Sequence, residues 1–166
     1  MDDRNIILAA AFAAAKHAGQ TRKYTGDLYI THPQAVVAIV RSVQHDAAML
    51  CAAWLHDVIE DTDTELSEIR SRWGSDVANL VDDLTDPSVP MDGNRAARRA
   101  IDRAHTALAS ARAKTIKLAD VIHNTSDISK APPAFAKLYL AEKALLLEVL
   151  RGGSAELWER AKLQVC

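Results

Sequence analysis

Cysteine is scarce in this 166-residue chain, and its two copies, Cys51 and Cys166, offer neither a disulfide framework nor the paired spacing of a cysteine-based metal site. Strand signals are missing as well. No apolar run can span a bilayer, because the Ala-rich stretch from Ile6 to Ala15 is too short. The chain starts with Met1-Asp2-Asp3, which is acidic where a signal peptide would be basic. We therefore expect a cytoplasmic protein that makes no membrane contact.

The overall charge is also unremarkable, and this limits the classes of partner. Hydrophobic residues make up 49% of the chain, charged residues 25%, and the formal net charge is −2. These values are ordinary for a globular protein and give no indication of nucleic-acid binding. A chain of this length can bury about two-thirds of its unfolded surface. With no internal repeat, low-complexity tract or long linker, residues 1–166 are expected to form one all-α domain.

Helical patterns separated by turn residues cover most of the sequence. A polar loop is expected from Gly19 to Thr31, and Thr64 and Ser75 are candidate N-caps on either side of Gly74. About eight or nine helices result. The predicted segments are Ile6–Lys16, Pro33–Val43, Ala47–Ile59, a helix from Thr64 to Gly74, one from Ser75 to before Pro87, and then Asn94–Ser110, Thr115–Asn124, Ala134–Leu150 and Ala155–Leu163.

The run from Trp54 to Thr62 holds an unusual set of ionisable groups. It is apolar at its start, yet it contains His56, Asp57, Glu60 and Asp61. Such groups are expensive to bury without partners. Residues four apart share one face of a helix, so the pattern predicts His56 next to Glu60 and Asp57 next to Asp61. This arrangement would place a metal ion beside a base.

Two further segments supply candidate ligands. His32 stands just before Pro33, a residue suited to the first turn of a helix, and Asp120 lies in an apolar helical run with His123 and Asn124 on its face. Two imidazoles and two carboxylates suit manganese, iron, cobalt or zinc better than calcium. A single buried histidine is more often a hydrogen-bonded core residue than a ligand, and spacing alone does not bring the segments together. The proposed ligands are His32, His56, Asp57 and Asp120.

The ordered motifs resemble the HD phosphohydrolase superfamily, and in detail its Rel/SpoT hydrolase branch. The resemblance covers roughly positions 8 to 128. It is carried by Ala15-Lys-His-Ala-Gly-Gln-Thr-Arg-Lys23, Tyr29-Ile-Thr-His-Pro33, His56-Asp-Val-Ile-Glu-Asp-Thr62, Trp73-Gly74 with Leu80-Val-Asp-Asp-Leu-Thr85, and Lys117-Leu-Ala-Asp-Val-Ile-His-Asn124.

This resemblance implies a compact helical bundle and a stand-alone small alarmone hydrolase, since 166 residues leave no room for the synthetase, TGS or ACT regions of the long enzymes. Such hydrolases remove the 3′-pyrophosphate from guanosine tetra- and pentaphosphate with a manganese ion, and some act on the adenosine counterparts. Another divalent transition metal would also suit the donor set. By resemblance, Glu60 and Asp61 accept or relay the proton. Without it, a solvated helix end explains this pair about as well.

Candidate nucleotide contacts come from three segments. The resemblance assigns Arg22 to stacking on the base, Lys23 to the nucleotide, and Asn124 to a nucleotide contact, while His123 is interpreted as structural. Arg95, Arg98, Arg99 and Arg103 form one helical stripe, which is more often a solvated face than an electrostatic funnel. Arg95 and Lys117 are the candidate phosphate contacts.

Two departures from the family pattern affect the expected substrate. Val121 replaces a cation beside Asp120, and Asp127 stands where the long enzymes have a hydroxyl near the base. The choice between guanine and adenine therefore stays open.

Three alternative hypotheses about the function remain. A different HD phosphohydrolase, such as a nucleoside 5′-monophosphatase or an NADPH 2′-phosphatase, would use the same ligands. A non-catalytic nucleotide-binding module would keep the fold without turnover. A purely structural helical module would leave the ionisable groups of the 54–62 run unexplained. The expected partner is a small-molecule nucleotide, and the sequence leaves the choice between monomer and homodimer open.

Overall fold

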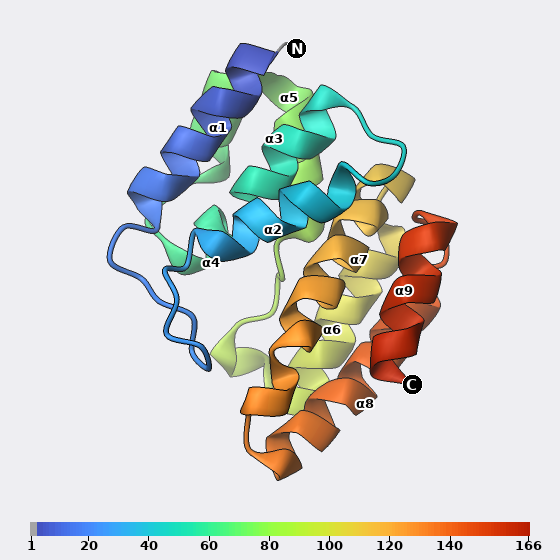
Figure 1. The fold of residues 1–166 in the computed structure, drawn as a ribbon. Coiled ribbons are helices and arrows are strands. Elements are labelled where there is room, and N and C mark those ends of the chain that lie inside the picture. The colour runs from blue at the N-terminus through green and yellow to red at the C-terminus, as the bar shows by residue number, and fades with distance from the viewer. Residues whose placement is uncertain (1–2) are drawn as a thin grey trace.

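The computed structural model describes residues 3–166, and within this range the regular secondary structure is helical (Figure 1). This confirms the all-α prediction. The described elements are α1 Asp3–Lys16, α2 Thr31–Val40, α3 Ala47–Leu55, α4 Val58–Asp61, α5 Leu66–Leu84, α6 Arg95–Leu108, α7 Ala111–Ser126, α8 Pro133–Val149 and α9 Ala155–Val165, with 3₁₀ turns at Pro90–Asp92 and Ile128–Lys130.

Helices α3 and α7 form the centre of the fold. Helix α3 packs against α1, α2, α5 and α7, and α7 also contacts α2, α5, α8 and α9. Small and aliphatic side chains cover most of the α3 surface, and all its residues except Ala47 and Trp54 are buried. Burial on every side explains why this helix lacks a polar face. Helix α3 ends at Leu55. His56, the first ionisable residue of the 54–62 run, therefore lies directly at the end of a buried helix.

The prediction of one continuous helix over Ala47–Ile59 is wrong. Helix α3 ends at Leu55, and α4 begins only at Val58. Asp57 takes φ −99° and ψ −6°, outside ideal helical geometry, and the His56 ring bonds the Ala53 carbonyl at the end of α3. Histidines commonly satisfy the free carbonyls of a helix C-terminus in this way. The break turns the His56 and Asp57 side chains toward one centre.

Gly74 interrupts α5, as the sequence suggested, with φ 84° and ψ 174° inside an otherwise continuous helix. The predicted cap is wrong, because Glu65 occupies the N-cap position and the Thr64 hydroxyl bonds that of Thr62. Another boundary also moves. Helix α7 starts at Ala111, before the predicted Thr115, because the Ser110 side chain caps it by accepting from the Ala113 N–H.

The polar segment between α1 and α2 folds back on itself. The Arg22 N–H donates to the Asp27 carbonyl and the Tyr29 N–H to the Gln20 carbonyl, and Thr21 and Leu28 form an isolated antiparallel bridge. This loop delivers His32 as the second residue of α2, as expected for the residue before Pro33. In the described range 3–166, no helix is both long and apolar enough to cross a membrane.

Gly74→Ala should destabilise the protein by about 1–3 kcal/mol, since an alanine at this φ and ψ is strained even though its Cβ meets nothing within 4 Å. Chemical denaturation measures the loss. Gly152→Ala is the matched control, because its Cβ would make only ordinary contacts with Lys114. Equal stability of the two variants would contradict the role given to the Gly74 backbone.

Candidate metal centre

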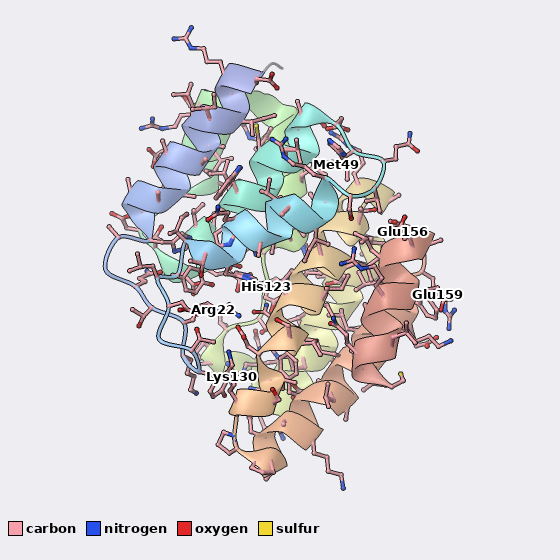
Figure 2. The ribbon with its side chains drawn as sticks, viewed as in Figure 1. Arg22, Met49, His123, Lys130, Glu156 and Glu159 are labelled. Atoms are coloured by element: carbon pink, nitrogen blue, oxygen red, sulfur yellow. The ribbon has the colours of Figure 1, made fainter. Side chains whose placement is uncertain are left out.

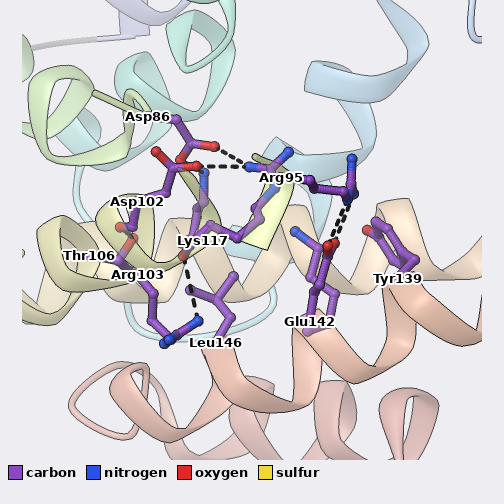
Figure 3. A pocket seen from close by; sticks show the side chains of 11 residues that line it. Asp86, Arg95, Asp102, Arg103, Thr106, Lys117, Tyr139, Glu142 and Leu146 are labelled. Carbon is purple, nitrogen blue, oxygen red and sulfur yellow. Dashed lines mark hydrogen bonds and ion pairs between the residues drawn. The ribbon is translucent and has the colours of Figure 1, made fainter. Parts of the chain in front are cut away.

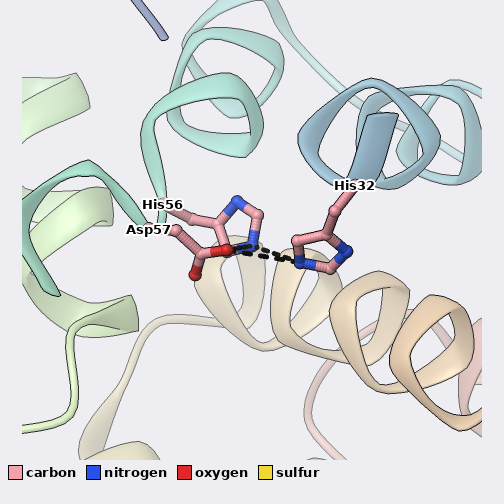
Figure 4. A group of neighbouring side chains, drawn as sticks. All are labelled: His32, His56 and Asp57. Atoms are coloured by element: carbon pink, nitrogen blue, oxygen red, sulfur yellow. Dashed lines mark hydrogen bonds and ion pairs between the residues drawn. The ribbon is translucent and has the colours of Figure 1, made fainter. Parts of the chain in front are cut away.

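Four side chains from three helical regions converge at one point. His32 comes from the start of α2, His56 and Asp57 from the junction between α3 and α4, and Asp120 from α7. His32 Nε2 lies 3.2 Å from His56 Nε2, 3.3 Å from Asp57 Oδ2 and 3.2 Å from Asp120 Oδ1. Figure 4 shows His32, His56 and Asp57 directed toward one another. The proposed ligand residues are therefore neighbours in space.

The donor set suits a divalent transition metal. One ligand atom each from His32, His56 and Asp57 lies within 4.8 Å of the other two, and both histidines are buried at 1% and 3% exposure. His56 Nδ1 lies 2.9 Å from the Ala53 carbonyl, which can only accept, so Nδ1 holds the proton. The Nε2 lone pair then faces the centre, as a metal requires. Asp120 Oδ1 lies 3.8 Å from His56 Nε2 and completes a mixed nitrogen and oxygen set.

In the metal-free state the same atoms compete for protons. Burial by itself would lower the pKa of His56, but the charges of Asp57 and Asp120 outweigh it and raise that pKa to about 9. Burial would likewise raise the pKa of Asp57 and Asp120, but the two imidazoles hold both well below their usual range. Protonated histidines therefore compensate the carboxylates in the metal-free state. A divalent cation would take over that role by displacing protons.

His123, interpreted from the sequence as structural, is a direct neighbour of the centre. Its Nδ1 lies 2.8 Å from His32 Nδ1, whereas His32 Nε2 faces His56, Asp57 and Asp120. Burial and the charges of His32 and Arg22 lower the pKa of His123 to about 4, so its ring is neutral and can accept. The His32 Nδ1–H donates to His123, which leaves His32 Nε2 free to bind a metal.

Sequence reasoning missed Tyr29. Its hydroxyl donates to Asp57 Oδ2 over 2.6 Å, and its ring stacks on His17 with a centroid distance of 4.6 Å. Burial and the neighbouring Asp57 charge raise the Tyr29 pKa, so the phenol stays protonated and remains a donor. A signal was available, because Tyr29 opens the same segment that supplies His32.

Glu60 and Asp61, the predicted proton-transfer residues, lie on α4 and line the cleft above the centre. Glu60 Oε1 accepts from the Asp86 N–H over 2.8 Å. Burial raises the pKa of Glu60 to about 7, against the opposing charge of Lys117. A carboxyl that titrates near neutral pH can both accept and return a proton.

The cleft has a volume of about 410 Å³. Arg22 lies in it with its guanidinium held from below, since Nη2 donates to Asn124 Oδ1 at 2.9 Å and to Asp127 Oδ2 at 3.3 Å. Lys23 extends over the rings of Tyr24 and Phe135. In Figure 2, Arg22 and His123 are labelled on the same side of the molecule. Four of the five predicted nucleotide contacts, Arg22, Lys23, Asn124 and Lys117, thus border one opening.

Arg95 and Lys117 lie around a recess between α6, α7 and α8 (Figure 3). Lys117 lines both recess and cleft, whereas Arg95 lines the recess but not the cleft. Arg95 makes a two-pronged ion pair with Glu142, with nitrogen to oxygen distances of 2.6 and 2.8 Å. Arg99 pairs with Asp86 and Asp102. At these two positions the arginine stripe is ion-paired rather than simply solvated.

A family model described as HD domain matches residues 9–147. The chain belongs to the HD-domain family.

Within this family, the chain is similar to animal proteins named guanosine-3′,5′-bis(diphosphate) 3′-pyrophosphohydrolase MESH1. Identity to the human and mouse proteins is 33% over 168 residues, covering 95% of this chain and 90% of theirs. The Xenopus tropicalis protein is 38% identical over 135 residues, or 77% of this chain and 72% of its own. A solved structure titled as a metazoan ortholog of SpoT that hydrolyzes ppGpp matches with a TM-score of 0.88 and 29% identity, covering 99% and 95% of the two chains. The chain is thus homologous to enzymes that hydrolyse a pyrophosphate ester.

The stability of the metal-free protein should fall as pH rises. A His56 pKa near 9, above the unfolded value of 6.5, contributes up to about 3 kcal/mol that is fully present below pH 6.5 and is lost as pH rises through 9. Denaturant unfolding in the presence of a chelator measures this loss. His56→Asn should flatten the profile between pH 6.5 and 9. A wild-type profile that is flat in this window would contradict the compensation described above.

Replacing His123 by Phe should weaken divalent-metal binding about 10- to 100-fold, because His32 loses the acceptor that orients its ring. Calorimetric titration of manganese or zinc into the metal-free variant measures the affinity. His45→Phe is the matched control, since His45 is exposed and its ring bonds only the Val43 carbonyl. Unchanged affinity in the His123 variant would show that His32 orients without its help.

Proposed function

We propose that this protein is a divalent-metal-dependent pyrophosphohydrolase that removes the 3′-pyrophosphate from alarmone nucleotides. The products would be a nucleoside di- or triphosphate and pyrophosphate. The proposal rests on one observation above all: His32, His56, Asp57 and Asp120 meet at the base of a cleft in which Glu60 has a pKa near 7. Homology to proteins named as guanosine-3′,5′-bis(diphosphate) 3′-pyrophosphohydrolases supports the same reaction.

The four ligands would hold manganese or a similar divalent ion. When bound, such an ion screens the charge of the pyrophosphate ester and makes water a better nucleophile. Tyr29 keeps Asp57 in place through its hydroxyl, and the Ala53 carbonyl and His123 fix the two imidazole rings. Ligands restrained in this way lose little freedom when a metal binds.

Glu60 and Asp61 would move the proton. Both line the cleft, one helical turn beyond the metal ligands. Partial desolvation raises the pKa of Glu60 to about 7, so this carboxyl can gain or lose a proton near neutral pH. Glu60 can therefore take a proton from the attacking water, and Asp61 can help to relay it.

The purine would lie on Arg22. Asn124 and Asp127 hold the guanidinium group in one orientation, and a flat cation of this kind stacks well on a base. Lys23 borders the same opening as a point charge for phosphate. Arg95 and Lys117 remain the candidate phosphate contacts of the recess, although Glu142 already neutralises Arg95.

The guanosine form, ppGpp or pppGpp, is the better-supported substrate, because the relatives are named for it. The adenosine forms ppApp and pppApp use the same phosphates and belong in the same assay. We further propose that residues 1–166 act as one hydrolase domain. In support, the last helix α9 packs on the central α7, and the solved structural relative matches over 99% of the chain.

The deciding experiment compares ppGpp and ppApp with a nucleoside 5′-monophosphate and NADPH, each with manganese, and follows pyrophosphate and orthophosphate separately. Pyrophosphate release from an alarmone supports the proposal and measures the base preference. Orthophosphate alone, from the monophosphate or NADPH, would replace it with the other HD phosphohydrolase activities. No turnover together with nucleotide binding would identify a binding module.

Asp57→Asn should abolish metal-dependent turnover, and Glu60→Gln should lower kcat by about 10²- to 10⁴-fold while metal binding persists. Steady-state kinetics and metal titration together separate the two effects. Asp63→Asn is the matched control, because Asp63 is exposed near the same helix end and pairs only with Lys16. Undiminished turnover in the Asp57 variant would refute the metal centre.

A further inference from the structure

The recess between α6, α7 and α8 opens onto the cleft that holds the candidate metal centre. It is small, about 50 Å³, and Asp86, Arg99, Lys117, Tyr139 and Lys143 line both spaces. Tyr139 and Lys143 lie on α8, which follows the motifs that predicted the site. The cleft therefore has a wall that the sequence motifs do not describe.

Most cations of this wall already have partners. Arg95 is paired with Glu142, and Arg99 with Asp86 and Asp102. The Lys117 ammonium donates to the Leu84 carbonyl at 3.2 Å and lies 3.5 Å from Asp86. These groups are neutralised before any ligand arrives.

Lys143 differs from its neighbours. Its side chain is half-buried. Among residues 3–166, no carboxylate lies within 4.0 Å of its ammonium and no hydrogen-bond acceptor within 3.5 Å, and the group lies 5.1 Å from the centre of the Tyr139 ring. A half-buried lysine without an ion-pair partner is partly desolvated, and this costs free energy. Burial lowers the pKa of Lys143 even though Asp120 opposes this shift. The wall thus presents one uncompensated ammonium toward the ligand space.

We propose that Lys143 binds a second phosphate group of the substrate, separate from the one hydrolysed at the metal centre. The inference rests on the proposed function. If the 3′-pyrophosphate lies at the metal centre and the purine on Arg22, the remaining charged part of an alarmone is its 5′-diphosphate. In the cleft, Lys143 on α8 is a cation without an ion-pair partner that the proposed function has not yet assigned to any group of the substrate. The preferred substrate class is then a nucleotide phosphorylated at both the 3′ and the 5′ position.

This assignment differs from a generic basic patch in one measurable respect. A cation that merely attracts polyanions would favour every phosphorylated ligand alike. A lysine that contacts the 5′-phosphates selects only molecules that have them. The effect of removing Lys143 should therefore depend on the 5′ substituent.

The test compares the wild type and one variant on two substrates, one of which lacks the 5′-phosphates. K143M keeps the length of the side chain and removes its charge. For guanosine 3′,5′-bis(diphosphate) we expect kcat/KM to fall about 10- to 100-fold, mainly through KM, as for the loss of a charged hydrogen bond. For guanosine 3′-diphosphate, which lacks 5′-phosphates, we expect no change. K137M is the matched control, since Lys137 is an exposed lysine on the same helix.

A second readout does not need catalysis. Calorimetry with GDP and metal-free protein should show weaker binding to K143M than to the wild type and to K137M. Thermal denaturation should give a Tm for K143M equal to or above that of the wild type, because a partly desolvated ammonium without an ion-pair partner is removed. This last measurement separates a loss of recognition from a loss of folding.

Several outcomes would overturn the inference. An equal loss on both substrates would place Lys143 in the chemistry of the metal centre, and no loss on either would make it a space-filling side chain. If the wild type hydrolyses no alarmone but K143M still weakens GDP binding, the proposed function fails and the phosphate contact stands. If the wild type hydrolyses alarmones and the K143M effect is independent of the 5′ substituent, only the inference fails.

Discussion

The structure depends on the need to compensate four ionisable groups that meet at one point, three of them buried and Asp57 half-buried. Two imidazoles and two carboxylates meet at the end of α3, a helix whose own side chains are apolar. Such a cluster is costly unless protons or a cation balance its charge and hydrogen bonds fix its geometry. Protons fill this role in the metal-free state. The donor set is equally suited to a divalent ion, which links the stability of the fold to the proposed chemistry.

This requirement explains features around the centre that would otherwise look unrelated. The break between α3 and α4 frees the His56 ring to bond the Ala53 carbonyl and turns Asp57 toward the Tyr29 hydroxyl. On the other side of the His32 ring, His123 Nδ1 accepts a hydrogen bond from His32 Nδ1–H. The two histidines make these contacts through Nδ1, which faces away from the centre. Asp57 accepts the Tyr29 hydroxyl with a lone pair of its carboxylate. The outer hydrogen bonds thus prepare the inner atoms for a metal.

The cations around the cleft are held in two different ways. Along α6 and α7 the cations are matched with acids, so the wall is polar without a large excess of charge. At Arg22 the acids and amides orient the cation rather than bury it. Lys143 has neither an ion-pair partner nor a hydrogen bond that orients it, which is why it is the most informative side chain outside the candidate metal centre. Differences of this kind arise from helix packing, and no single segment of the chain encodes them.

The helical segments were largely predictable, because periodicity, prolines and Gly74 are local signals. Boundaries moved where local signals competed. Ser110 is the N-cap of α7, which moves the start of this helix to Ala111, and Glu65 rather than Thr64 occupies the N-cap of α5. The one qualitative error was the continuous helix through His56 and Asp57. Helical propensity alone does not register that His56 and Asp57 must turn toward His32, which lies 24 and 25 residues away, and that His56 also faces Asp120, 64 residues away.

The sequence by itself determined the all-helical class, the family resemblance and the residue types able to hold a metal, since these follow from composition, periodicity and ordered motifs. Only the tertiary structure decided that His32, His56, Asp57 and Asp120 lie within a few ångströms, that His123 and Tyr29 hold them, and that Lys143 faces the cleft without a partner. The physical reason is that burial and charge compensation are properties of packed neighbours. Residues distant in the chain become neighbours only when the helices pack.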